Sequence, residues 1–183
     1  FDVGFIPRDD AVAASAMIDD ATAAVILELV QGVAGAYDLN ADFVTAIARA
    51  CEAHGAVLII DEVQTGVGRC GTAFAVDHYD IQADMLTTAK ALGAGFPCGA
   101  LLLSDEMAAD LGKGDLGTTF GGGPMACALI HTVVTTIQRD RLLDNVQTLS
   151  DRLQNECLTG PITAVSGKGF LLGLHCDKGA SDV

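Results

Sequence analysis

The sequence predicts an α/β protein in which a mostly parallel sheet lies between two layers of helices. Short apolar segments rich in β-branched residues alternate along the chain with longer segments whose apolar residues recur every three or four positions. The first pattern is typical of buried strands and the second of amphipathic helices. Because strands that alternate with helices are joined by crossovers, we expect them to run parallel, with ligand sites where they end.

The first part of the chain predicts two helices, each followed by a strand. Residues 9–20 (DDAVAASAMIDD) predict a short helix, and residues 22–29 (TAAVILEL) predict a strand that is apolar on both faces and covered by helices on both sides. Residues 40–55 (NADFVTAIARACEAHG) predict an amphipathic helix, with an asparagine as its N-cap and a glycine as its stop. This helix leads directly into a strand at residues 56–61 (AVLIID).

The second part predicts two further strands, a short helix, two long helices and a last strand. They are expected at residues 83–89, 98–104, 104–112, 124–140, 143–157 and 166–176. The two consecutive long helices indicate a domain boundary near residues 139–143. We therefore predict one domain over residues 1–138 and, over residues 139–183, an interdomain helix and the start of a second domain. Because the first residue is not methionine, we expect a piece of a longer protein.

Composition excludes several classes of function. The chain has 10 Lys+Arg against 24 Asp+Glu, and its basic residues are scattered, so no nucleic-acid partner is expected. Charged or polar residues interrupt every apolar run before the roughly 18 residues of a membrane span, so no membrane partner is expected. The six cysteines form no C-x-x-C pair, which favours free thiols in a reducing cytoplasm over a zinc site or a disulfide framework.

Two acidic residues stand where the predicted strand at residues 56–61 ends. Asp61 and Glu62 begin the stretch DEVQTGVGR, which continues into a glycine-containing loop. A carboxylate at such a strand end can hold a protonated ring nitrogen, but it can equally cap a solvated loop. The glycines match neither the phosphate loop of nucleotide hydrolases nor the dinucleotide-binding pattern, so they do not indicate a nucleotide site.

Lys90 lies between a predicted strand and a glycine-rich turn, in LTTAKALGAGFP. Its side chain can extend into solvent, or its amine can be desolvated and act as a nucleophile that forms a Schiff base. Further along, Thr118 and Thr119 stand among the glycines of GDLGTTFGGGP. Such a loop suits a phosphate group or is simply flexible. These stretches taken one at a time leave both alternatives open.

The three stretches together resemble a known family. DEVQTGVGR, DMLTTAKALGAGFPCGALL and GTTFGGGPMACA are similar in order, spacing and wording to class III, pyridoxal-phosphate-dependent aminotransferases of fold type I, most of all to the acetylornithine and ornithine group. The resemblance implies the three-layer α/β/α large domain of that fold, which binds the cofactor, followed by the start of a C-terminal α+β small domain. It also implies pyridoxal 5'-phosphate as cofactor and a cytoplasmic homodimer.

The resemblance assigns a role to each matching residue of the first two stretches. Lys90 would form the Schiff base with the cofactor and shuttle protons, and Asp61 would pair with the pyridine nitrogen. Val63 would pack on one face of the ring, and Gln64 would contact its 3-oxygen. Glu62 belongs to the same cofactor-binding motif, although a structural role suits it better.

The remaining matches concern the phosphate and the substrates. Thr119 would bind the cofactor phosphate of the neighbouring subunit, with Thr118 close to substrate. Glu28 in LELVQGVAG matches the first glutamate of the family's VEPIQGEGG and is expected in the substrate site. Val33 replaces the second glutamate of that pattern, and Gly123 replaces the asparagine of the family's GGNP. The valine leaves the choice of substrate open.

The resemblance implies that an amino group moves from acetylornithine, ornithine or a similar ω-amino donor to 2-oxoglutarate. The alternatives are glutamate-1-semialdehyde aminomutase, a GABA or diaminobutyrate aminotransferase and, from another class, a noncatalytic cofactor-binding fragment. An early phosphate-binding turn and a late carboxylate-binding arginine are expected outside this sequence. Five arginines of this sequence do not match the position of that carboxylate-binding arginine: Arg8, Arg69, Arg139, Arg141 and Arg152.

Overall fold

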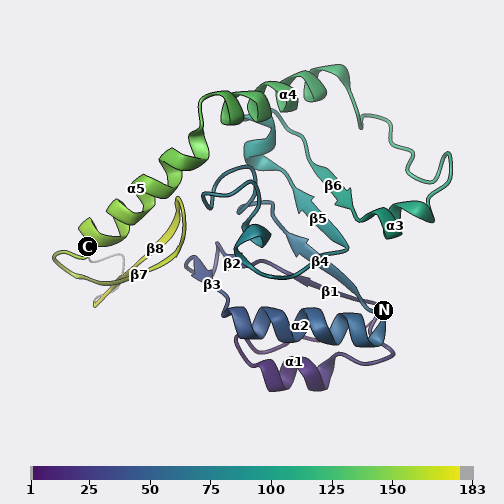
Figure 1. Ribbon diagram of the computed structural model, residues 1–183, viewed down its shortest axis with the longest axis horizontal. Helices are drawn as coiled ribbons and strands as arrows, with labels where there is room; N and C mark the ends of the chain where they lie inside the picture. Colours follow the sequence, from purple (N-terminus) through teal and green to yellow (C-terminus); the bar gives the residue numbers. More distant parts are fainter. Residues whose placement is uncertain (1, 178–183) are drawn as a thin grey trace.

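The computed structural model of the chain describes residues 2–177, and its centre is a four-stranded sheet (Figure 1). The strands lie in the order β1 (Ala24–Leu27), β4 (Val57–Asp61), β5 (Met85–Thr88) and β6 (Ala100–Leu103). β1, β4 and β5 run parallel, and β6 runs antiparallel to β5. The connection from β5 to β6 is too short for a crossover, so β6 reverses direction. The predicted α/β fold is confirmed, with a sheet that is mostly but not entirely parallel.

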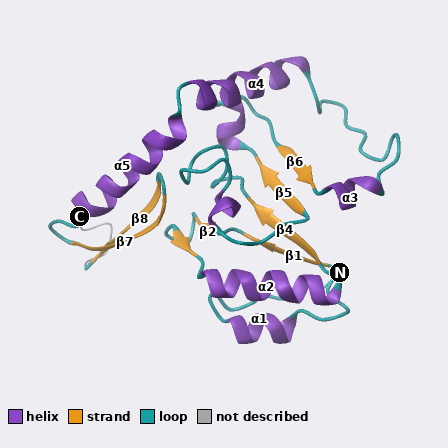
Figure 2. Cartoon of the chain, viewed as in Figure 1, coloured by secondary structure: helices purple, strands orange, loops and turns teal. Residues whose placement is uncertain are grey.

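Helices α1 (Ala11–Met17) and α2 (Ala41–His54) pack together on one side of the sheet (Figure 2). The ends of α2 follow the signals in the sequence. The Asn40 side-chain oxygen accepts a hydrogen bond from the Asp42 backbone N–H at 2.8 Å, and Gly55 ends the helix in the left-handed conformation with φ 67°. The predicted helix is therefore confirmed at both ends.

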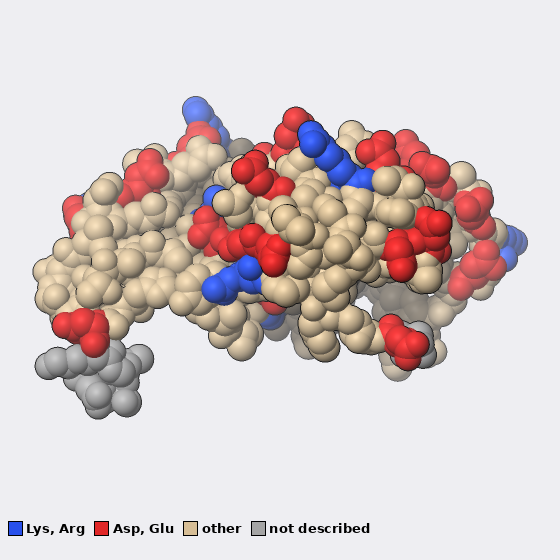
Figure 3. Space-filling view, turned by 90° about the horizontal axis from the view of Figure 1, so that it is seen from below, with Lys and Arg blue, Asp and Glu red and all other residues tan. Residues whose placement is uncertain are grey.

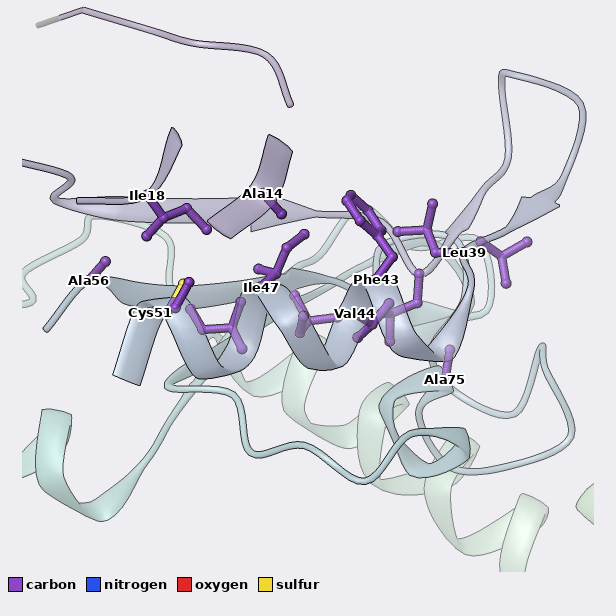
Figure 4. Close-up of a cluster of buried hydrophobic side chains, with 14 of the residues drawn as sticks. Ala14, Ile18, Leu39, Phe43, Val44, Ile47, Cys51, Ala56 and Ala75 are labelled. Carbon is purple, nitrogen blue, oxygen red and sulfur yellow. The ribbon is translucent and has the colours of Figure 1, made fainter. Parts of the chain in front are cut away.

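The largest buried cluster forms where α1 and α2 meet β1 and β4 (Figure 4). On α2 its members include Phe43, Val44 and Ile47, and on β4 they include Leu58 and Ile60. Each such side chain contributes about 1.5–3 kcal/mol when it is fully buried. This packing fixes β4, whose last residue is Asp61, so the core sets the position of a candidate site residue.

The opposite face of the sheet is more open. Ile26 on β1 is 62% exposed and Leu101 on β6 is 52% exposed. Strand pairing puts both side chains on the face away from α2, because paired residues point to the same side of a sheet. Within residues 2–177, helices thus cover β1 on one face only, and the second helical layer expected beside β1 is not supplied by this part of the chain.

The second half of the chain continues with three helices and a hairpin. These are α3 (Asp105–Ala109), α4 (Pro124–Arg139), α5 (Leu142–Glu156), β7 (Ile162–Lys168) and β8 (Leu171–Cys176). The single strand predicted over residues 166–176 is wrong. The chain reverses direction between β7 and β8, which pair antiparallel. Gly169 lies in the tight turn between them and has φ 58°, which glycine adopts without strain. The proposed boundary between α4 and α5 stays a prediction.

A small hairpin near the start of the chain, which the sequence did not predict, packs against the hairpin of β7 and β8. It consists of β2 (Val30–Gln31) and β3 (Tyr37–Asp38), and strands of two residues are too short to show any periodicity. The Ser166 hydroxyl donates to the Gly35 carbonyl oxygen at 3.1 Å. A Cβ at Gly173 would lie 2.0 Å from the same oxygen, so the two hairpins can approach this closely only with glycine.

All six cysteines lie within the described residues and are free thiols. Burial, with a smaller contribution from the charge of Asp84, raises the pKa of Cys51 to about 11. Burial and then the charge of Glu62 raise the pKa of Cys70 to about 12. Thiols with such pKa values are almost entirely protonated at neutral pH and therefore unreactive. These two cysteines are packing residues.

The surface is predominantly acidic. In the view of Figure 3, carboxylate side chains are spread over the displayed face among a few separate Lys and Arg side chains. The formal net charge is -14. Among residues 2–177, none of the helices is both long enough and apolar enough to cross a membrane.

Candidate active site

Three parallel strands end at one edge of the sheet, and predicted site residues follow each of them. Leu27, the last residue of β1, pairs with Ile60 on β4. The next residue of each chain segment is Glu28 after β1 and Asp61 at the end of β4, so these two residues lie beside each other. Asp61 pairs with Thr87 on β5, and Lys90 follows two residues after β5 ends. Ligands of α/β proteins bind at such carboxyl ends.

The Asp61 carboxylate is held through one of its two oxygens. Oδ1 accepts a hydrogen bond from the Val63 backbone N–H at 2.9 Å and another from the Thr87 hydroxyl at 3.1 Å. Within residues 2–177, no hydrogen bond reaches Oδ2. The carboxylate is half-buried. It is therefore oriented by the protein, with one oxygen left for a ligand.

Glu62 is fully buried, at 0% exposure, and both of its carboxylate oxygens are engaged. Oε1 accepts the Val76 backbone N–H at 2.8 Å, and Oε2 accepts the Thr65 hydroxyl. These contacts tie the end of β4 to the 3-10 turn η1 (Ala75–His78). Of the two roles considered for Glu62, the geometry favours the structural one, because neither oxygen is left for a cofactor.

The turn between β2 and β3 contacts the loop after β4. The Gln64 side chain lies against Gly32, where a Cβ would come within 2.7 Å of Gln64 Oε1. The Gly32 N–H donates to Glu28 Oε2 at 3.4 Å. A side chain at position 32 would push the end of the Gln64 side chain aside, and Val63 is half-buried. The structure thus brings Glu28, Val63 and Gln64 to the same edge as Asp61.

Lys90 is the first residue of the 3-10 turn η2 (Lys90–Gly93), against which α4 packs. Its φ of 46° lies in the left-handed region, which costs a non-glycine residue about 1–3 kcal/mol and is concentrated at functional sites. The side chain is exposed, so the described residues do not desolvate its amine as the nucleophile hypothesis expected. Lys90 is instead an exposed residue two positions after the carboxyl end of β5, the strand that pairs with β4 and Asp61.

Thr118 and Thr119 do not join this cluster within the chain. Both are exposed, on a segment between α3 and α4 that loops away from the sheet (Figure 1). The Thr118 hydroxyl accepts the Gly121 N–H at 3.3 Å, a local turn contact. Within residues 2–177, no hydrogen bond joins either threonine to Asp61 or Lys90.

The comparison with family models decides the family. The model described as aminotransferase class-III matches residues 9–182, nearly the whole chain. The chain belongs to the class III aminotransferases. Acetylornithine aminotransferase from Neisseria meningitidis serogroup A is 41% identical over 177 residues, which are 94% of this chain and 45% of that protein. The enzyme of the same name from Archaeoglobus fulgidus is 42% identical over 167 residues, 91% of this chain and 44% of that protein.

Solved structures show the same fold for this class III aminotransferase chain. Ornithine aminotransferase from Toxoplasma gondii ME49 matches with a TM-score of 0.86 at 28% identity, over 100% of this chain and 45% of that one. Acetylornithine aminotransferase from Elizabethkingia anophelis matches with a TM-score of 0.84 at 32% identity, over 94% and 45%. The chain thus spans about half the length of the relatives it matches.

Class III aminotransferases depend on pyridoxal phosphate, and a Toxoplasma gondii ornithine aminotransferase structure contains it at partial occupancy. The residues present here fit that cofactor. Within residues 2–177, Asp61 Oδ2 accepts no hydrogen bond and could pair with a protonated ring nitrogen, and the exposed Lys90 follows the neighbouring strand. The absence of a side chain at Gly32 leaves room for the Gln64 side chain.

Two positions depart from the family pattern. Val33, which stands for a glutamate, is 92% exposed in the loop between β2 and β3. Gly123, which stands for an asparagine, is the N-cap of α4 and offers no side-chain acceptor to the helix. Thr87 was not predicted as a site residue. It stands opposite Asp61 in the pairing of β4 with β5, a register that the bounds of the two predicted strands do not give.

Proposed function

We propose that this chain carries the cofactor-binding part of an ω-amino acid transaminase that moves an amino group from acetylornithine, ornithine or a similar donor to 2-oxoglutarate. The observation that supports the proposal is the position of the oriented Asp61 carboxylate and of the exposed Lys90 at the carboxyl ends of two neighbouring parallel strands. Sequence identities of 41% and 42% to acetylornithine aminotransferases favour this group of donors.

Pyridoxal phosphate supplies a protonated aromatic ring that withdraws electrons from the reacting carbon. Asp61 Oδ2 would accept the hydrogen bond of the ring nitrogen, and the negative charge of the carboxylate would keep that nitrogen protonated. The Lys90 amine would hold the cofactor covalently and, once a substrate amine takes its place, would hold the proton that leaves the substrate carbon. Val63 and Gln64 would contact the ring.

The remaining assignments concern the assembly and the substrates. Thr119 binds the cofactor phosphate in the site of a neighbouring subunit of a homodimer, and Thr118 and Glu28 lie near the amino-acid and 2-oxo-acid substrates. The projection of the loop that carries both threonines away from its own sheet supports this arrangement (Figure 1). The six free thiols favour a cytoplasmic location.

A panel of amino donors tests the function. The protein loaded with pyridoxal phosphate is incubated with 2-oxoglutarate and with acetylornithine, ornithine, γ-aminobutyrate or diaminobutyrate, and glutamate formation is measured. We expect ping-pong kinetics and the highest kcat/KM with acetylornithine or ornithine. The panel includes γ-aminobutyrate and diaminobutyrate because the exposed Val33 stands where the family pattern has a glutamate, which leaves the choice of donor open. Cofactor binding without transfer from any donor would identify a noncatalytic module.

Asp61→Asn is expected to retain pyridoxal phosphate and to lower kcat by about 100-fold, because the amide keeps the shape but not the charge that protonates the ring. The measurement compares the cofactor dissociation constant with kcat. Asp84→Asn is the control, since Asp84 lies at the other end of the sheet, where its carboxylate accepts the Leu58 N–H at 2.7 Å. Unchanged turnover in Asp61→Asn would refute the assigned role.

A further inference from the structure

We infer that Thr87 is a positioning residue that determines which oxygen of Asp61 meets the cofactor. The inference rests on the proposed function, since it concerns the same carboxylate. Thr87 stands directly opposite Asp61 in the parallel pairing of β5 with β4. Paired residues point to the same face of a sheet, so the hydroxyl and the carboxylate are neighbours by register.

Two donors converge on one oxygen of the carboxylate. The Thr87 hydroxyl donates to Asp61 Oδ1 at 3.1 Å and the Val63 N–H donates to the same atom at 2.9 Å. The terminal torsion of an aspartate is broad, so a carboxylate without such donors turns easily. Here the two donors hold it in one orientation, and Oδ2 is the oxygen turned to the ligand.

The donor from β5 adds something that the Val63 N–H cannot. Val63 is only two residues from Asp61, in the loop that follows β4, whereas Thr87 belongs to the strand that leads to Lys90 three residues later. The Thr87 hydroxyl therefore ties the ring-binding carboxylate to the strand that carries the candidate nucleophile. Loss of the hydroxyl is expected to loosen the position of Asp61 relative to Lys90.

The next residue offers a matched control. Thr88 is 3% exposed, and among the described residues its buried hydroxyl has no hydrogen-bond partner. Side chains alternate along a strand, so Thr88 points to the face opposite Thr87. Thr87→Val and Thr88→Val thus remove the same group from adjacent positions, but only the first removes a hydrogen bond. Thr88→Val is expected to leave cofactor binding unchanged.

The test measures the dissociation constant of pyridoxal phosphate by titration of the apoprotein, together with kcat and the KM of the amino donor. Thr87→Val is expected to weaken cofactor binding about threefold to tenfold, the effect of losing one hydrogen bond, and to lower kcat with KM within about twofold. Thr87→Ser, which keeps the hydroxyl, is expected to restore both to within about twofold of the wild type.

A double-mutant cycle separates positioning from a general structural effect. In an Asp61→Ala background, Thr87→Val is expected to change the cofactor dissociation constant no further, because the partner of the hydroxyl is gone. The same threefold to tenfold loss in that background would overturn the inference, as would a Thr87→Val protein that binds like the wild type. Failure of the wild type to bind pyridoxal phosphate would overturn the proposed function as well, so the two failures are distinguishable.

Discussion

Lys90→Ala is expected to abolish covalent attachment of pyridoxal phosphate and to lower turnover by about 10²–10⁴-fold from the loss of proton transfer alone. The Lys90 side chain is exposed, so the substitution is expected to change the free energy of unfolding by no more than about 0.5 kcal/mol. The measurement is borohydride reduction of the loaded protein followed by intact mass. The wild type is expected to gain the mass of one reduced cofactor and the variant none.

Two further substitutions sharpen this result. Lys113→Ala removes another exposed lysine, from the loop between α3 and α4, and is expected to keep the reducible adduct. Lys90→Gly removes the same amine but tolerates φ 46° without strain, so it is expected to be more stable than Lys90→Ala by about 0.5–1 kcal/mol. An adduct that survives in both Lys90 variants would show that another amine holds the cofactor.

The parts of the fold that the sequence predicted best depend on neighbouring residues. Asn40 and Gly55 are the cap and stop of α2, and each acts on backbone groups within a few positions of itself. Asp61 and Lys90 stand near the ends of apolar stretches and before glycines, a local pattern that marked them as candidates but left their roles open. Such signals are local, so they can be recognised before the arrangement of the strands is known.

Other features depend on how distant segments meet. The bond from Thr87 to Asp61 joins residues 26 positions apart, and the bond from Val76 to Glu62 joins residues 14 apart. Neither follows from periodicity, because periodicity gives the face of a strand but not its partner. The reversal of β6 and the hairpin at Gly169 were missed for a related reason, since strand direction is decided by the length of the connection.

The role of the loop between α3 and α4 could not be predicted from local sequence for a different reason. Thr118 and Thr119 stood in a glycine-rich stretch, which alone did not distinguish a phosphate site from a flexible loop. The structure places both on an exposed segment that leads away from Asp61 and Lys90. If a second subunit completes the site, as we propose, the spacing within one chain carries no sign of it. Only the resemblance of the motif to its family suggests the role.

Glu62→Ala is expected to lower the free energy of unfolding by about 3–5 kcal/mol, the largest stability effect that we predict for the site. The substitution removes a side chain of 0% exposure and leaves the Thr65 hydroxyl and the Val76 N–H without their acceptor. An unpaired buried polar group costs about 1–3 kcal/mol, and the cavity adds to that cost. Urea unfolding monitored by far-UV circular dichroism measures the difference.

Glu62→Gln and Glu52→Ala are the matched controls for this effect. The amide oxygen of glutamine can still accept the Val76 N–H, so Glu62→Gln is expected to cost roughly half as much as alanine. Glu52 is exposed on α2, and its replacement is expected to stay within about 0.5 kcal/mol of the wild type. If Glu62→Ala lowered the free energy of unfolding no more than Glu52→Ala, Glu62 would not stabilise the loop after β4. A contact with the cofactor would then be the better explanation for its place in the motif.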